Sequence, residues 1–119
     1  INNGMEKYTI NKIIKITKVK TQSKKILLFG VTYKPDVADT RNSIPLNIWK
    51  KLKVKYKQKI FCVDSRVDKE FAKKNNIRAQ VEEEKYDYII PLVKHKDFET
   101  QFQKAKSNNK KIKLIDLWG

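Results

Sequence analysis

The side chains best suited to chemistry lie in one short loop, residues 32–41, which follows an apolar run and precedes a predicted helix. Tyr33 offers a ring face to a base or a sugar, and Lys34 offers a point charge to a phosphoryl oxygen. Ser43 is suited to cap the helix, and Pro45 fits its first turn. Because a helix N-terminus has free backbone N–H groups and partial positive charge, the loop predicts a site for a phosphate.

The charged residues of the same loop also allow a purely structural interpretation. Asp36, Asp39 and Arg41 could pair with one another in a turn that only shapes the loop. Residue types alone do not separate such a turn from a binding site, so both interpretations stay open.

The glycine content of this loop argues against a dinucleotide site. Gly30 is the one glycine near the end of the apolar run. The G-x-G-x-x-G pattern needs three glycines, so that the backbone can approach a pyrophosphate closely. The sequence therefore predicts a Rossmann-like sheet that does not bind NAD at its first turn.

Other reactive residues are few, and none predicts a catalytic group. Cys62 lies within an apolar run and is expected in the core, and a single cysteine excludes an internal disulfide and favours a reducing compartment. His95 is flanked by lysines that lower its proton affinity, so we expect a residue at the entry to a helix and not a general base. One histidine, one cysteine and no ligand-spaced carboxylates predict no metal site.

Apolar runs and helical periodicity alternate along most of the chain. Strands are expected at residues 26–31, 60–63, 79–81, 86–93 and 112–117. Helices are expected at residues 5–19, after Ser43, and at residues 67–75 and 97–106. The alternation predicts right-handed β-α-β units and a parallel sheet between helices, with the first helix outside it. Ligands of such sheets bind beyond the carboxyl ends of the strands, which indicates residues 31–43, 64–66 and 93–97.

The size and charge of the chain set limits on its function. Its 119 residues suit one domain, and no apolar run approaches the roughly 20 residues of a membrane span. The net charge is +15, from 28 Lys and Arg against 13 Asp and Glu, and such a charge attracts polyanions. Because the lysines are scattered and form no stripe, solvated surfaces are favoured over nucleic-acid binding. A basic nucleic-acid-binding α/β module remains the alternative.

A longer sequence pattern that includes this loop is typical of one protein family. Residues 30–43 read GVTYKPDVADTRNS. They resemble the C-terminal domain of the UDP-glucose/GDP-mannose dehydrogenase family, in which a G-x-[TA]-[YF]-K strand end is followed by D-x-R-x-S/T at the start of a helix. Similar stretches extend over essentially the whole chain: residues 1–5 (INNGM), 61–68 (FCVDSRVD), 86–90 (YDYII) and 95–98 (HKDF). Members that act on UDP-N-acetylhexosamines are the most similar.

The resemblance implies an α/β fold, a Rossmann-like parallel sheet flanked by helices, with an N-terminal helix left over from a central domain. Residues 1–23 would be the last helix and linker of that central dimerisation domain, and residues 24–119 the C-terminal UDP-sugar-binding domain. The implied contacts to the UDP-sugar are Tyr33, Lys34, Arg41 and Ser43.

The resemblance also implies a chemistry that this chain does not perform alone. The family oxidises the sugar C6 hydroxyl to a carboxylate in two NAD-dependent hydride transfers, through a thiohemiacetal on a cysteine. That cysteine and the NAD site are expected upstream, in the NAD-binding and central domains, and Cys62 is not the counterpart. The whole enzyme is expected to be a cytoplasmic homodimer in surface-polysaccharide precursor synthesis, with no membrane segment.

One departure from the family pattern concerns the last predicted strand. Its usual D-x-R/K-G segment supplies a basic residue that helps to hold the nucleotide sugar, whereas residues 116–119 read DLWG and place Trp118 there. The resemblance thus allows a degenerate copy, an altered substrate, or a Trp118 that stacks in place of the cation. A structural fragment that only packs against the central domain through its N-terminal helix is a further alternative.

Overall fold

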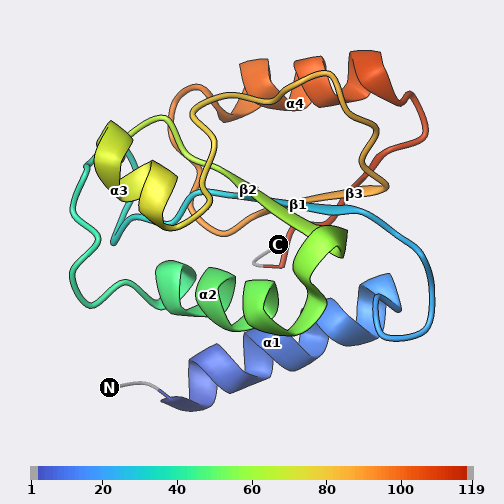
Figure 1. Cartoon of the computed structure of the whole chain (residues 1–119), viewed down its shortest axis with the longest axis horizontal. Helices are drawn as coiled ribbons and strands as arrows, with labels where there is room; N and C mark the ends of the chain where they lie inside the picture. The colour runs from blue at the N-terminus through green and yellow to red at the C-terminus, as the bar shows by residue number, and fades with distance from the viewer. Residues whose placement is uncertain (1–2, 118–119) are drawn as a thin grey trace.

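The computed structural model describes residues 3–117, apart from the side chain of Asn3 (Figure 1). The expectations for Ile1, Asn2 and Trp118 lie outside the described residues. In chain order the elements are α1 (Asn3–Thr17), β1 (Ile26–Phe29), α2 (Ile44–Tyr56), the 3-10 helix η1 (Lys57–Lys59), β2 (Ile60–Val63), α3 (Lys69–Lys74), β3 (Tyr88–Pro91), α4 (Phe98–Asn108) and β4 (Lys113–Leu114).

The four strands form one parallel sheet in the order β2-β1-β3-β4. The two central pairings are in step, because Ile26 of β1 lies opposite Ile60 of β2 and Tyr88 of β3. This confirms the predicted Rossmann-like α/β fold. The first strand in the sequence is a central strand of the sheet, so the loop that follows it has neighbours on both sides.

Helices cover both faces of the sheet, with α1 and α2 on one face and α4 on the other (Figure 1). Leu28 of β1 packs into the core on the α2 side, and its neighbours Leu27 and Phe29 pack into the core on the α4 side. All four residues of β1 are buried. A strand that is covered on both faces has to be apolar at every position, which explains the continuous apolar run.

The helix that follows the loop, α2, starts as the sequence predicts. Ser43 is its N-cap, and Pro45 lies in its first turn. Ile48, Trp49 and Leu52 are each 1% exposed and form its buried face. Packing of this face fixes the start of the helix relative to the carboxyl end of β1.

Several predicted strands are shorter or absent. β1 ends at Phe29 because Gly30 has a φ of 91° and turns the chain, and β3 ends at Pro91, which has no N–H to continue the ladder. β4 spans only Lys113–Leu114. No strand forms at the predicted residues 79–81: pairing with β2 is confined to a single parallel bridge at the preceding residue, Arg78, and the N–H of Val81 donates to Oε1 of Gln101 at 2.8 Å.

Helix ends also differ from the expected ones. α1 spans Asn3–Thr17, two residues earlier at each end than predicted. α3 begins only at Lys69, because the Asp68 carboxylate accepts hydrogen bonds from the N–H groups of Glu70 and Phe71 and so caps the helix. Its Phe71 packs against the α2 side of the core.

α1 shares the core of the sheet. Its Ile13 is fully buried in the same cluster as Trp49 of α2, as is Val19 just after the helix. Glu6 is 6% exposed and forms an ion pair with Lys51 of α2. None of the helices within residues 3–117 combines the length and the apolar character that a membrane crossing demands.

Candidate functional site

The strand order creates one favourable place for a ligand. From β1 the chain crosses through α2 to β2 on one side, and the next crossover brings β3 to the other side of β1. β1 and β3 are therefore neighbouring strands whose following loops lead away from each other. In open α/β sheets ligands bind in the crevice at such a switch point.

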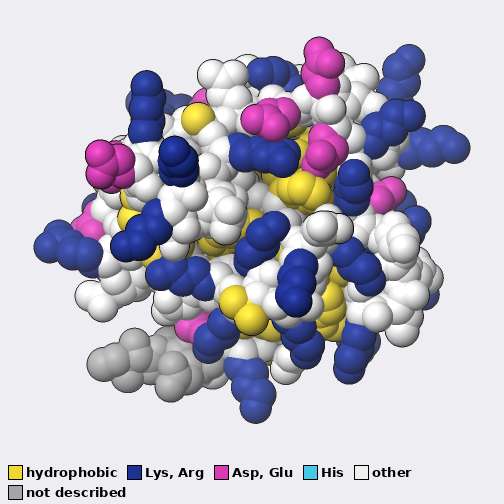
Figure 2. Space-filling model, viewed as in Figure 1, with side chains coloured by type: hydrophobic (Ala, Val, Ile, Leu, Met, Phe, Trp, Pro, Cys, Tyr) yellow, Lys and Arg dark blue, Asp and Glu magenta, His cyan; other side chains and the backbone are white. Residues whose placement is uncertain are grey.

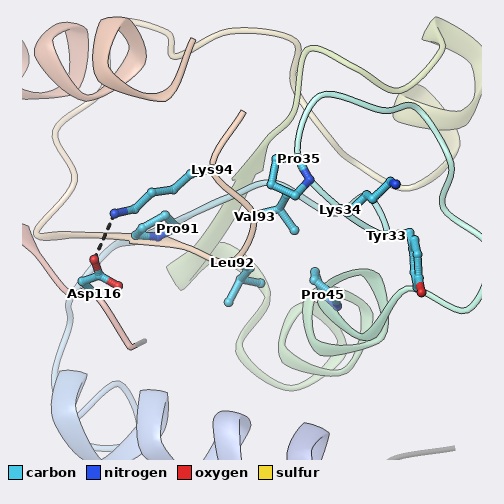
Figure 3. A pocket seen from close by; sticks show the side chains of 9 residues that line it. All are labelled: Tyr33, Lys34, Pro35, Pro45, Pro91, Leu92, Val93, Lys94 and Asp116. Carbon is cyan, nitrogen blue, oxygen red and sulfur yellow. Dashed lines mark hydrogen bonds and ion pairs between the residues drawn. The ribbon is translucent and has the colours of Figure 1, made fainter. Parts of the chain in front are cut away.

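A cavity of about 430 Å³ lies at this switch point. Its wall combines the loop after β1, the first turn of α2, the end of β3 and the segment after β4 (Figure 3). The lining residues are Tyr33, Lys34, Pro35, Pro45, Pro91, Leu92, Val93, Lys94 and Asp116. Two of the four residues predicted to contact a UDP-sugar, Tyr33 and Lys34, are thus at the cavity.

The cavity has an apolar middle and charged flanks. Figure 3 shows Pro35, Leu92 and Val93 in the middle, with Lys34 and Tyr33 to one side and Lys94 to the other. The Nζ of Lys94 lies 2.9 Å from Oδ2 of Asp116. An apolar surface with a few convergent polar groups is typical of small-molecule sites, and the two ammonium groups favour an anion.

The loop holds Tyr33 and Lys34 by their backbone and leaves their side chains accessible. The N–H of Tyr33 donates to the carbonyl of Asp39 at 2.7 Å, and Oγ1 of Thr32 donates to the carbonyl of Lys34 at 2.9 Å. Thr32 is fully buried, whereas the Tyr33 side chain is among the most exposed large apolar ones, at 59%. The ring and the ammonium group are therefore available to a ligand without a change in the loop.

Ser43 lies beside the cavity with its hydroxyl group engaged. Its Oγ donates to the carbonyl of Val31 at 2.6 Å and accepts from the N–H of Leu46 at 3.1 Å, and the residue is 2% exposed. Pro45 has no N–H to offer. The main contribution of the start of α2 to the site is therefore its partial positive charge, and hydrogen-bond donors contribute less.

Arg41 lies on the far side of Tyr33. Its guanidinium pairs with Asp39, with both N–O distances at 3.1 Å. Hydrogen bonds from the Arg41 side chain and N–H lower the pKa of Asp39 below its ordinary value. Both residues border a second hollow of about 310 Å³, together with Tyr33 and Asn42. Arg41 is thus linked to the first cavity only through Tyr33.

Asp36 does not join this turn, contrary to the structural interpretation of the loop. Its Oδ1 accepts from Nη2 of Arg66 at 2.8 Å and from the N–H of Lys96 at 2.9 Å. The bond from the Lys96 N–H is the main reason that the pKa of Asp36 lies below its ordinary value, and Arg66 adds to it. Asp36 therefore ties the loop after β1 to the loops after β2 and β3.

A buried pair, Asp64 and His95, joins the same three loops. Nε2 of His95 lies 3.0 Å from Oδ2 of Asp64, and both side chains are fully buried. Asp64 also accepts from the N–H groups of Val31 and Arg66, each at 2.7 Å. On its other ring nitrogen, Nδ1, His95 accepts from the N–H of Asp36 at 2.9 Å.

These contacts define the protonation of the pair. Burial raises the pKa of Asp64, but the hydrogen bonds from His95, Val31 and Arg66 outweigh it, so the pKa lies below its ordinary value and the carboxylate is ionised. An ionised carboxylate only accepts hydrogen bonds, so Nε2 of His95 carries a proton. Nδ1 has to be unprotonated, since it accepts from Asp36.

Residue types alone did not reveal this pair. His95 does lie at the entry to α4, as expected, with its carbonyl accepting from the N–H of Phe98 at 3.0 Å. The partner acid is Asp64, at the end of β2. A signal was present, because both residues fall in the segments that the carboxyl-end rule indicates, residues 64–66 and 93–97.

The other candidate groups have no part in the site. Cys62 is 1% exposed within β2, and burial raises the pKa of its thiol well above the ordinary value, so it does not form the thiolate that a nucleophile needs. Among residues 3–117 no three His, Cys, Asp or Glu side chains come together as they would around a metal ion.

Comparison with known proteins gives a family match and a fold match. The model of the UDP-glucose/GDP-mannose dehydrogenase family, UDP binding domain, matches residues 27–119. No curated protein sequence matches the chain.

Two solved structures of the UDP-N-acetyl-mannosamine dehydrogenase Cap5O from Staphylococcus aureus have the same fold. The native structure superposes with a TM-score of 0.68 at 23% identity, over 99% of this chain and 28% of that one. The derivative structure gives a TM-score of 0.68 at 24% identity, over 87% of this chain and 25% of that one. The chain spans about a quarter of the length of these relatives.

Proposed function

Because the chain belongs to the UDP-glucose/GDP-mannose dehydrogenase family, as its UDP-binding domain, we propose that it holds the UDP part of a nucleotide sugar in the cavity between the ends of β1 and β3. The observation that carries the proposal is the position of Tyr33 and Lys34. They lie on the loop that leaves the central strand, and both line the cavity at the switch point of the sheet.

Each part of a nucleotide sugar has a suitable surface in this cavity. Lys34 provides an ammonium group for a phosphate oxygen, and the ring of Tyr33 provides a face for the base or the sugar. Leu92 and Val93 provide an apolar floor, and Lys94 adds a second positive charge on the opposite flank. The ammonium group of Lys34, and that of Lys94 once it exchanges Asp116 for a phosphate oxygen, favour a doubly charged diphosphate over a neutral sugar.

The remaining predicted contacts take different parts in the proposal. Arg41 reaches the ligand from the second hollow, beside Tyr33, after its guanidinium exchanges Asp39 for a phosphate oxygen. Ser43 acts through its bonds to Val31 and Leu46, which hold the strand end and the helix start in place.

The residues after β1 do not fit NAD. Gly30 is the only glycine of that loop, and a Cβ built on it would meet the carbonyl oxygen of Val93, so the open side of this glycine faces the end of β3 and the glycines that a pyrophosphate requires are missing. We therefore place NAD elsewhere in the whole enzyme, where it would accept hydride as the C6 hydroxyl of the sugar is oxidised to a uronate. The fragment alone is expected to bind substrate and not to oxidise it.

We further place residues 1–23 in the central dimerisation domain of a homodimeric whole enzyme, and residues 24–119 in the UDP-sugar-binding domain. The inner side of α1 shares the core of the sheet, and its outer side supports contact with the rest of the central domain. Met5, Tyr8 and Ile16 are 40%, 58% and 40% exposed on it, and Tyr8 and Ile16 border a hollow of about 430 Å³. Exposed apolar groups of this kind favour contact with a further protein surface. A UDP-N-acetylhexosamine is the proposed substrate.

Titration with UDP tests the binding proposal. Lys34→Ala removes one charge from the cavity and is expected to weaken UDP binding about five- to tenfold, since a solvent-exposed charged contact contributes roughly 1 kcal/mol. Lys110→Ala is the matched control, because it removes the same charge from the segment that enters β4, at the amino ends of the strands, whereas the cavity lies at their carboxyl ends. Calorimetry should show a weaker affinity for the first variant alone. Equal affinities in all three proteins would remove Lys34 from the site, and no binding by the unaltered chain would refute the proposal.

A further inference from the structure

We propose that His95 is a positioning residue, which holds the Lys34–Asp36 segment in its binding conformation by presenting an unprotonated Nδ1 to the N–H of Asp36. His95 can have this role only if the cavity binds UDP as proposed above. The residue itself is 2% exposed and does not line the cavity, so it acts on a ligand only through the loop.

The backbone that His95 contacts is strained. Asp36 has a φ of 61°, in the left-handed region that residues with a side chain rarely adopt. Such a conformation persists only where its surroundings hold it. Asp36 is held by Nδ1 of His95 on its N–H, and by Arg66 and the N–H of Lys96 on its carboxylate. Two of these three contacts come from the segment after β3.

This strained residue borders the cavity wall. Lys34 and Pro35, which line the cavity, directly precede Asp36 in the chain. Relaxation of Asp36 to an ordinary φ would redirect the chain next to Pro35 and so move the ammonium group of Lys34. Geometry at Asp36 therefore sets the shape of one wall of the cavity.

Asp64 selects the form of His95 that can hold Asp36. Its ionised carboxylate accepts a hydrogen bond from the protonated Nε2, with Nε2 and Oδ2 3.0 Å apart, and this leaves Nδ1 as the acceptor. The ring is confined by Phe29, whose ring meets it edge-on with centroids 5.9 Å apart. Asp64 thus selects the tautomer of His95, and His95 holds the backbone of Asp36. Asp36 in turn shapes the wall that carries Lys34.

Two variants of His95 separate the two ends of its ring. His95→Asn keeps an acceptor, the amide oxygen, close to the position of Nδ1. His95→Gln places its amide close to the position of Nε2 and leaves the N–H of Asp36 without an acceptor. Both lose the contact of the ring with Phe29, and His95→Asn also loses the hydrogen bond to Asp64, so a merely structural role would not weaken UDP binding more in His95→Gln than in His95→Asn.

The measurement is UDP affinity by calorimetry, with the midpoint of urea unfolding for each protein. We expect His95→Asn to bind UDP within about threefold of the unaltered chain, and His95→Gln to bind at least tenfold more weakly at comparable stability. Equal affinity in the two variants would overturn the role of Nδ1. Absence of UDP binding by the unaltered chain would refute the function proposed above, whereas normal binding by His95→Gln would overturn this inference alone.

A spectroscopic measurement decides the matter if the variants do not fold. Long-range ¹H–¹⁵N spectra of the unaltered chain distinguish protonated from unprotonated imidazole nitrogens at its single histidine. We expect a proton on Nε2 and none on Nδ1. A proton on Nδ1 would overturn the proposal, because that nitrogen could no longer accept from Asp36.

Discussion

Two ammonium groups flank the cavity, and they are held differently. Lys34 extends from the loop after β1, whereas Lys94 is paired with Asp116 and lies 5.7 Å from the centre of the Phe98 ring. The side chains of Lys94 and Asp116 are 50% and 31% exposed, so water screens the pair and its contribution to stability is small. A diphosphate in the cavity can therefore compete with Asp116 for the ammonium group of Lys94.

Replacement of Lys94 with methionine tests this contribution. Lys94→Met keeps an unbranched side chain against Phe98, removes the charge, and is expected to weaken UDP binding about three- to tenfold. Lys106→Met is the matched control, because Lys106 lies 5.5 Å from the centre of the Phe102 ring in a similar contact and does not line the cavity. Calorimetric titration of both variants should show the loss only for Lys94. An unchanged affinity in Lys94→Met would exclude this residue from the site.

The sequence allowed some of these residues to be found and not others. Tyr33 and Lys34 could be predicted because they follow an apolar strand directly and precede a helix cap. The pairing of Asp64 with His95, 31 residues apart, could not, because it depends on the order of the strands in the sheet. Lys94 falls in residues 93–97, which the carboxyl-end rule indicates, but its place at the same cavity as Lys34 depends on β3 lying next to β1.

Among the secondary-structure elements, the ends of β1 and β3 set the width of the cavity. Gly30 makes their close approach feasible. Its φ is 91°, and a Cβ at this position would clash with the carbonyl oxygen of Val93 and lie 2.9 Å from the Val93 Cβ. A side chain would therefore have to push the two strand ends apart as well as adopt a left-handed conformation.

Gly30→Ala is accordingly expected to destabilise the fold by about 3 kcal/mol or more, because strain and a backbone clash add. Gly4→Ala makes the same change at an exposed position in α1 and is expected to be neutral or stabilising by up to roughly 1 kcal/mol. Urea unfolding of the two variants measures both effects. A stability of Gly30→Ala equal to that of the unaltered chain would contradict the close packing of the two strand ends.

Element types were easier to predict than element ends. The parallel sheet, the four main strands and the cap of α2 all followed from apolar runs and capping residues. The strand at residues 79–81 was wrong because its backbone pairs with the side chain of Gln101, and such a partner leaves no pattern in the local sequence. β1 ended earlier than predicted because the chain turns at Gly30, and the positive φ of this residue depends on the close approach of Val93 from the end of β3.

At the scale of the whole molecule, the chain is strongly basic. The net charge of +15 comes from 28 Lys and Arg against 13 Asp and Glu, and Figure 2 shows Lys and Arg side chains over all of the face drawn, with Asp and Glu mostly in its upper half and on its left side. A dispersed charge attracts polyanions weakly and without a defined site. The basic composition therefore favours solvation of the surface over recognition of nucleic acid.

Salt dependence separates the two kinds of binding. Any association with duplex DNA should fall steeply between about 50 mM and 200 mM salt, because each neutralised phosphate releases counterions. UDP binding should weaken much less, since few charges and an apolar floor contribute to it. Fluorescence anisotropy of a labelled duplex and calorimetry with UDP, each at both salt concentrations, provide the comparison. Saturable DNA binding at the lower salt that falls steeply at the higher salt, without UDP binding at either, would favour the nucleic-acid alternative.

The position of the ligand on the chain remains the decisive quantity, and an NMR titration measures it. With ¹⁵N-labelled chain and increasing UDP, we expect saturable shifts to be largest at the amides of residues 31–34, 36 and 92–96, around the cavity at the ends of β1 and β3. Saturable shifts confined to another part of the chain, or no saturable shifts, would contradict a UDP site at this cavity.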